Sequence, residues 1–87
     1  MSFSVLFGSQ PSKFIKKLET QLKERLRKKI EKLQEDPFPQ EVERVEAYKN
    51  EKAFRVRVGD YRVLYLVRFG KKQILIAKID KRGRVYK

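Results

Sequence analysis

Residues 53–65 read Ala53-Phe54-Arg55-Val56-Arg57-Val58-Gly59-Asp60-Tyr61-Arg62-Val63-Leu64-Tyr65. In this stretch two runs of alternating apolar and polar residues flank a Gly-Asp pair, a pattern typical of a β-hairpin with a two-residue loop. Glycine at the first loop position favours a type II′ turn. With Gly59 and Asp60 as the loop, we expect four cross-strand pairs: Val58 with Tyr61, Arg57 with Arg62, Val56 with Val63, and Arg55 with Leu64.

Side chains alternate between the two faces of a strand, so this register predicts one apolar face and one basic face. The apolar face carries Phe54, Val56, Val58, Tyr61, Val63 and Tyr65, and the basic face carries Arg55, Arg57 and Arg62. Like charges directly opposite each other in a sheet are destabilising. We therefore interpret the pairing of Arg57 with Arg62 as a place where an anion binds.

The charge of the chain points to a polyanionic partner. Its 23 basic and 11 acidic residues give a net charge of +12, which favours binding to nucleic acid or to a membrane surface. From Ala53 onward only Asp60 and Asp80 are acidic, so most of the excess charge lies in the C-terminal part. Abundant Lys and Glu also fits a hyperthermophile protein, but that interpretation accounts less well for the arginine cluster.

The chain contains no Cys and no His. This excludes disulfides, thiolate nucleophiles, zinc sites of the Cys/His kind and catalysis by a His base or acid, and we expect neither a metal nor a cofactor. The apolar opening from Phe3 to Phe7 is too short for a signal peptide, and no apolar run reaches membrane-spanning length. We therefore expect a cytoplasmic protein of one domain, residues 1–87, with no membrane partner.

Two helices are predicted after a first strand over residues 2–7. Their apolar positions have helical spacing and are Phe14, Ile15, Leu18, Leu22, Leu26, Ile30 and Leu33. A single helix from Pro11 to Glu35 would be about 37 Å long, whereas a domain of this size has a radius of gyration of about 12 Å. We therefore expect a break near Glu19, with Thr20 capping the second helix and Ser9 the first.

The rest of the sheet follows from the C-terminal half. The second strand of the hairpin continues to Phe69, and Gln73 to Ile79 is apolar on both faces, as in a covered central strand. Val42 and Val45 are either short-strand residues or packing anchors. The predicted fold is α+β: an N-terminal strand, an antiparallel helical hairpin, then a largely antiparallel sheet, four strands in all, with the helices packed on one face.

The arginines of the basic face, together with Arg82, Arg84 and Tyr86 near the C-terminus, suit RNA chemistry. Guanidinium groups bind phosphate through a bidentate fork and keep their charge, so a cluster of them stabilises a pentacoordinate phosphate. RNA supplies its own nucleophile, the 2′-OH, and a tyrosine stacks on a base or takes part in proton transfer. Most basic sheets bind nucleic acid without cutting it, so these residues alone leave both outcomes open.

Residues 54–65 and the closing Lys81-Arg82-Gly83-Arg84-Val85-Tyr86 resemble the RelE family, the toxins of RelBE-type toxin–antitoxin pairs, and especially its archaeal branch. The resemblance extends over essentially the whole chain. The Gly-Asp-Tyr-Arg turn is typical of the wider RelE/ParE superfamily, and the terminal basic residues with Tyr86 favour RelE itself. The resemblance implies a ribosome-dependent endoribonuclease, an mRNA interferase that cuts mRNA in the A site by metal-free 2′-OH attack and inhibits translation.

The resemblance also implies roles for particular residues. Arg55 and Arg57 match the two basic strand residues of the family's active site, and Arg57 would have a general-base or 2′-OH-orienting role. Arg62 matches the arginine that stabilises the transition state. Arg82 would lie near the leaving 5′-oxygen, and Tyr86 would stack on the mRNA base. The additional RNA contacts expected from the tail are Lys81 and Arg84.

Two departures from the family's pattern shape these expectations. Some members have lysines where this chain has Arg55 and Arg57, and the very high pKa of arginine makes proton abstraction harder, so orientation of the 2′-OH is the expected role. The sequence ends at Lys87 without the C-terminal helix of some bacterial members. We therefore expect a RelB-like antitoxin to wrap the monomeric toxin and to cover or distort the arginine face.

Two alternatives remain open at the level of the sequence. One is a ParE-like toxin that acts on DNA gyrase, although Arg57, Arg62, Arg82 and Tyr86 together argue against it. The other is a non-catalytic RNA- or ribosome-binding domain whose arginines only hold phosphates. Both RNA functions predict a steep salt dependence, so salt does not separate them.

Overall fold

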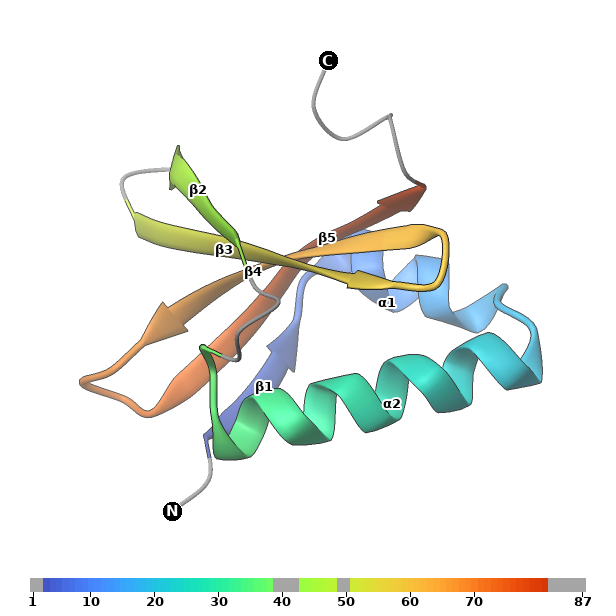
Figure 1. The fold of residues 1–87 in the computed structure, drawn as a ribbon, viewed down its shortest axis with the longest axis horizontal. Coiled ribbons are helices and arrows are strands. Elements are labelled where there is room, and N and C mark those ends of the chain that lie inside the picture. The colour runs from blue at the N-terminus through green and yellow to red at the C-terminus, as the bar shows by residue number, and fades with distance from the viewer. Residues whose placement is uncertain (1–2, 39–42, 49–50, 82–87) are drawn as a thin grey trace.

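The computed structural model describes residues 3–38, 43–48 and 51–81. The fold is α+β, with both helices on one face of a five-stranded sheet of order β1-β5-β4-β3-β2 (Figure 1). In chain order the elements are β1 (Ser4–Phe7), α1 (Ser9–Lys16), α2 (Thr20–Glu35), β2 (Glu43–Tyr48), β3 (Glu51–Val58), β4 (Tyr61–Arg68) and β5 (Gln73–Lys81).

The central hairpin forms as predicted. The paired residues of β3 and β4 include Val58 with Tyr61, Arg57 with Arg62 and Arg55 with Leu64, which confirms the predicted register. Gly59 has a φ of 60°, and Asp60 is not among the residues with positive φ. Because a type I′ turn needs positive φ at both positions and a type II′ turn only at the first, these signs confirm type II′.

The predicted strand count is wrong, because residues 43–48 form a fifth strand. This strand, β2, lies at the edge of the sheet antiparallel to β3 and contains Val45, whereas Val42 lies outside the described residues. The sheet is also mixed, since β1 pairs with β5 in parallel. Parallel strands need a long crossover connection, and here the two helices lie within that connection.

The chain reverses between α1 and α2, which confirms the predicted break (Figure 1). The predicted caps are wrong: Gly8 and Glu19 occupy the N-cap positions without side-chain hydrogen bonds, and Ser9 and Thr20 are the first helical residues. The Gly8 N–H still bonds to Ile76 of the sheet while the Gly8 carbonyl accepts from Ser12. Strand and helix therefore meet at one residue, which leaves no capping position for Ser9. Neither helix is long and apolar enough to cross a membrane.

The main core lies between the helices and the sheet. From α2, Leu26, Ile30 and Leu33 pack against the buried apolar side chains of β3, β4 and β5. Tyr65 is fully buried there, and its hydroxyl donates a 2.6 Å hydrogen bond to the carbonyl of Pro37. Because Pro37 follows the end of α2 at Glu35, this bond ties the end of the helix to the centre of the sheet.

Candidate nucleic-acid interface

The face of the sheet opposite the helices carries two neighbouring rows of charged side chains. In the first row, Arg57 of β3 lies opposite Arg62 of β4, and Arg62 lies opposite Asp80 of β5. The second row runs across four strands through Glu43, Arg55, Leu64 and Lys78. Directly opposed residues have Cβ atoms about 5 Å apart, and the rows are two residues, about 7 Å, apart along each strand. We call this surface the arginine face.

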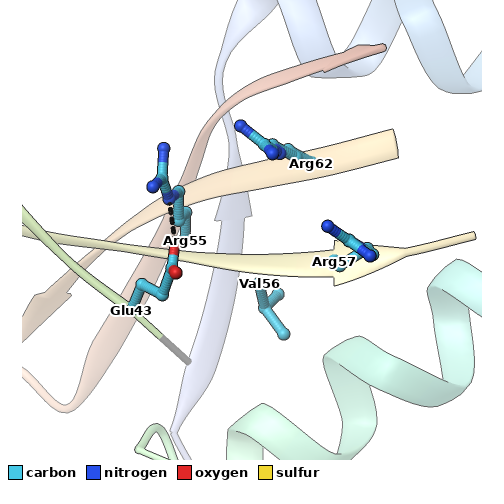
Figure 2. Close-up of a pocket in the computed structure, with 5 residues that line it drawn as sticks. All are labelled: Glu43, Arg55, Val56, Arg57 and Arg62. Atoms are coloured by element: carbon cyan, nitrogen blue, oxygen red, sulfur yellow. Dashed lines mark hydrogen bonds and ion pairs between the residues drawn. The ribbon is translucent and has the colours of Figure 1, made fainter. Parts of the chain in front are cut away.

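A pocket of about 310 Å³ opens on the arginine face and is lined by Glu43, Arg55, Val56, Arg57 and Arg62. Figure 2 shows the three arginines projecting from the same side of neighbouring strands, with Glu43 reaching Arg55 from β2, while Val56 points toward α2. The volume of this pocket is at the lower end of the range for small-ligand sites. The sequence therefore predicted correctly that Arg55, Arg57 and Arg62 come together.

The Arg55 side chain is fixed by an ion pair. Its Nε donates to Oε1 of Glu43 at 2.5 Å, and the arginine side chain is 26% exposed against 64% for the glutamate. A hydrogen bond at Nε sets the plane of the guanidinium group, because the five N–H donors form a rigid fork. Glu43 thus orients one of the three cations that line the pocket.

Sequence reasoning missed Glu43, because residues 43–48 were not predicted as a strand of the sheet, and a register shift adds to the difficulty. Tyr48 pairs with Glu51, and an uninterrupted hairpin counted from that pair would set Arg44 opposite Arg55. The strand pairing shifts by one residue between Val45 and Tyr48, so that Glu43 lies opposite Arg55 instead. A β-bulge of this kind inserts one extra residue into a strand, and alternation alone does not reveal it.

A second register shift, in β5, places a carboxylate opposite Arg62 as well. Tyr65 pairs with Ile76 but Leu64 pairs with Lys78, so one extra residue lies in β5 at this point. Without it Arg62 would lie opposite Ile79; with it Arg62 lies opposite Asp80. The shift also lets Ile76 and Ile79, three residues apart, both be buried in the main core. Two bulges thus place a carboxylate opposite Arg55 and another opposite Arg62.

Arg57 differs from Arg55 in the partners of its guanidinium group. It is exposed, and within the described ranges no hydrogen bond or ion pair engages its guanidinium group. Asp80, by contrast, accepts a 2.8 Å hydrogen bond from the backbone N–H of Lys81. Arg57 is accordingly a cation whose donors can all be offered to a ligand in the pocket.

The remaining predicted site residues do not line this pocket. Lys81 is exposed at the end of β5 and pairs with Tyr61, so its position in the register belongs to the helix-covered face. Arg82, Arg84 and Tyr86 lie outside the described residues. In the part of the chain that the structure describes, no three acidic side chains gather into a group that could hold a metal ion.

Known proteins are similar to this chain in sequence and in fold. The family model described as "ParE toxin of type II toxin-antitoxin system, parDE" matches residues 5–86. A Methanocaldococcus jannaschii protein named "Putative toxin RelE1" is 32% identical over 88 residues, which cover 100% of this chain and 98% of that protein. The toxin fold in the archaeal RelE–RelB complex of Pyrococcus horikoshii matches with a TM-score of 0.84 and 32% identity, covering 98% of this chain and 100% of that chain.

A bacterial structure shows the same fold at lower sequence identity. The isolated Escherichia coli RelE toxin matches with a TM-score of 0.74 and 23% identity. The match covers 98% of this chain and 92% of that chain. The fold is therefore common to archaeal and bacterial toxins.

Proposed function

Because this chain belongs to the RelE/ParE family of toxins of type II toxin–antitoxin systems, we propose that it is a ribosome-dependent endoribonuclease. In this proposal it cleaves mRNA in the ribosomal A site without a metal and so inhibits translation. The observation that carries the proposal is the pocket of about 310 Å³ lined by Arg55, Arg57, Arg62 and one carboxylate. Three guanidinium groups around one cavity suit a phosphate that gains negative charge during reaction.

The reaction is an internal transfer at phosphorus. The 2′-oxygen forms a bond to the adjacent phosphorus while the bond to the 5′-oxygen breaks, which leaves a 2′,3′-cyclic phosphate and a 5′-OH end. The 2′-OH gives its proton to a carboxylate, and the leaving 5′-oxygen takes a proton from a water molecule, so the protons balance. Arg62 and Arg57 stabilise the phosphate oxygens of the pentacoordinate transition state, since they lie directly opposite each other on the arginine face.

Glu43 accepts the proton of the 2′-OH. An arginine remains protonated in proteins and so cannot take up that proton, whereas a carboxylate can. Glu43 lines the pocket, is 64% exposed and reaches the arginine cluster through Arg55. Positioned acid–base groups contribute about 10²- to 10⁴-fold to a rate. Arg55 then holds the carboxylate in place, which replaces the general-base role that the family's pattern would give to a strand lysine.

The terminal residues complete the proposed site. Arg82 lies near the leaving 5′-oxygen and stabilises the negative charge that develops on it, Tyr86 stacks on the mRNA base, and Lys81 and Arg84 contact the RNA backbone. These roles are carried over from the resemblance in sequence. Stacking on an aromatic ring suits any unpaired base.

The proposed partner is a RelB-like antitoxin. The Pyrococcus horikoshii relative, 32% identical, was crystallised as a RelE–RelB complex. With a net charge of +12, this chain favours an acidic segment that folds on binding. The toxin acts in the cytoplasm as a monomer once the antitoxin is removed.

Inhibition of DNA gyrase is the second candidate function, because the description of the matching family model names ParE. The pocket argues for the nuclease: three guanidinium groups and a carboxylate in one cavity have no evident use in an inhibitor that only binds. A gyrase supercoiling assay with the purified toxin separates the two functions.

The test of the nuclease is cleavage of a defined mRNA on programmed ribosomes, with naked RNA in parallel. We expect cutting on ribosomes only, and a loss of about 10²- to 10³-fold in Arg62→Ala, as for removal of one transition-state donor. Lys71→Ala is the matched control, because it removes one positive charge from the exposed turn between β4 and β5. A folded, ribosome-binding wild type that does not cut, or an Arg62→Ala variant as fast as the control, would overturn the proposal.

A further inference from the structure

The outer edge of β5 changes its partner along its length. Up to Ile76 the partner is β1: the N–H groups of Ser4 and Gly8 donate to the carbonyls of Lys72 and Ile76, both at 2.9 Å. The strand β1 ends at Phe7, and the chain then turns into α1, which packs beside the end of β5 (Figure 1). Beyond Ile76 the outward backbone groups of β5 therefore need a different partner.

The side chain of Gln10 is that partner. Its Nε2 donates to the carbonyl oxygen of Ile79 at 2.7 Å, and its Oε1 accepts from the N–H of the same residue at 2.9 Å. A side-chain amide carries both a donor and an acceptor, as a peptide group does. Gln10 therefore stands in for one more residue of β1 at this edge, although it belongs to the first turn of α1.

The two bonds of Gln10 fit only the bulged form of β5. The carbonyls that face β1 belong to Lys72 and Ile76, and successive residues of a regular strand point their backbone groups to opposite sides. Without the extra residue between Ile76 and Lys78, the next outward groups would belong to Lys78, and those of Ile79 would face β4. Because Gln10 bonds to Ile79 instead, its bonds require the extra residue.

The same extra residue decides what Arg62 faces. With it Arg62 lies opposite Asp80, and without it Arg62 would lie opposite Ile79. Opposite charges across neighbouring strands attract, whereas an isoleucine side chain offers a guanidinium group no acceptor. A bulge also leaves one residue unpaired in the ladder. The bulged register therefore needs an interaction that favours it.

We propose that Gln10 is a positioning residue of the arginine face: its amide holds β5 in the bulged register and so keeps Asp80 opposite Arg62. The inference rests on the proposed function for the reaction that Arg62 serves. Gln10 does not line the arginine pocket, so it acts without touching the RNA. A slip by one residue moves a strand by about 3.3 Å, and a misplacement of about 1 Å costs up to about 10²-fold in rate.

The register of β5 can be measured without reference to activity, by nuclear Overhauser effects between backbone protons of β4 and β5. In the free wild-type toxin we expect cross-strand signals between Arg62 and Asp80. Gln10→Met keeps the length of the side chain and removes both bonds. In this variant the signals between Arg62 and Asp80 should weaken, and signals between Arg62 and Ile79 should appear. A Gln10→Met variant with the wild-type signals would overturn the proposal.

Gln34→Met is the matched control. The Gln34 side-chain amide also bonds to the backbone of the sheet, since it donates to the Phe3 carbonyl at 2.9 Å, but it does so at the start of β1. Both variants lose a side-chain bond to the backbone, so we expect similar midpoints of urea unfolding. Only Gln10→Met should change the signals of Arg62. The same change in both variants would mean a general loosening of the fold and would overturn the proposal.

Cleavage of mRNA on programmed ribosomes measures the consequence for the reaction. We expect kcat of Gln10→Met to fall about tenfold with KM for the ribosome unchanged, because Gln10 touches no RNA. Gln34→Met should keep both constants at their wild-type values. A loss in KM with kcat unchanged would show that Gln10 contributes to binding and would overturn the positioning role.

A double-mutant cycle shows whether Gln10 acts through Asp80. Asp80→Asn removes the charge opposite Arg62, and we expect it to lower kcat about tenfold as well. Combined with Gln10→Met it should lower kcat no further, because the two changes break the same arrangement. Fully additive losses would overturn the proposal. A wild-type toxin that does not cut refutes the nuclease instead, and the register of β5 in Gln10→Met then still decides the role of Gln10.

Discussion

The two faces of the sheet differ in what holds them in place. On the helix-covered face, side chains from β3, β4 and β5 join those of α2 in one buried apolar cluster. The arginine face has only a small apolar cluster around Ala53, Leu64 and Leu66, and its prominent groups are two rows of charges. Burial of apolar surface stabilises folded proteins, whereas opposed arginines do not. The first face therefore maintains the fold, and the second carries the proposed site.

The strongest test of this division is Leu33→Ala on the helix-covered face. Leu33 is fully buried in the main core, and such truncations cost about 2–5 kcal/mol of unfolding free energy. We expect a loss in that range in urea unfolding, with normal cleavage by the fraction that stays folded. If Leu33→Ala were as stable as wild type, the core between α2 and the sheet would not be the main source of stability.

On the arginine face we expect the reverse, a loss of activity with little loss of stability. Glu43→Gln keeps the oxygen that accepts from Arg55 Nε but no longer takes up a proton, so ribosomal cleavage should fall about 10²-fold or more. The midpoint of urea unfolding should change little, because an exposed ion pair contributes about 0–1 kcal/mol.

Glu35→Gln is the matched control for this change, since it removes the same charge from an exposed position at the end of α2. Equal cleavage by Glu43→Gln and wild type would show that Glu43 only positions Arg55. In that case Glu43→Ala, which removes the bond as well, should still reduce cleavage.

A third substitution compares a buried hydrogen bond with the apolar packing of Leu33 in the main core. Tyr65→Phe keeps the ring and removes the hydroxyl that donates to the Pro37 carbonyl at 2.6 Å. An acceptor left buried without a partner costs about 1–3 kcal/mol, so this variant should be less destabilised than Leu33→Ala. Thermal unfolding measures the difference. A Tyr65→Phe variant as stable as wild type would mean that water replaces the hydroxyl.

Parts of both faces of the sheet could be predicted from the sequence. The hairpin register and the gathering of Arg55, Arg57 and Arg62 follow from a periodicity of two residues, which is visible in the sequence. The helix break follows from the length of the helical pattern compared with the size of the domain. The strand β2 was not predicted as such, because Glu43-Arg-Val-Glu-Ala-Tyr48 has too few β-branched and aromatic residues for a clear strand signal.

The parts that could not be predicted depend on pairings between distant residues. The parallel pairing of β1 with β5 joins residues 69 positions apart, such as Ser4 and Gln73, and no local pattern indicates it. Glu43 and Asp80 reach the arginines through bulges, which break the alternation on which sequence reasoning depends. The predicted roles of Arg82, Arg84 and Tyr86 stay predictions.

The smallest expected effect lies on the solvent side of α2, away from both faces of the sheet. Arg27 bonds to Glu24 and Glu31, and its hydrogen bond to Glu24 lowers the pKa of that carboxyl below its ordinary value. A carboxyl with a lowered pKa in the folded state stabilises the protein above its unfolded pKa of about 4.3. That contribution is lost as the pH falls through the folded pKa. Because both side chains are about half exposed, solvent screens the pair and the effect is small.

Thermal unfolding of Glu24→Gln between pH 2 and pH 7 checks this sign. We expect the variant to be slightly less stable than wild type at pH 7 and the two curves to converge in acid, where wild-type Glu24 is protonated. The Glu35→Gln variant is again the control, since no ion pair engages Glu35 within the described segments. Curves for Glu24→Gln and wild type that stay parallel down to pH 2 would show that Arg27 does not hold Glu24 in solution, and that α2 depends on its buried side alone.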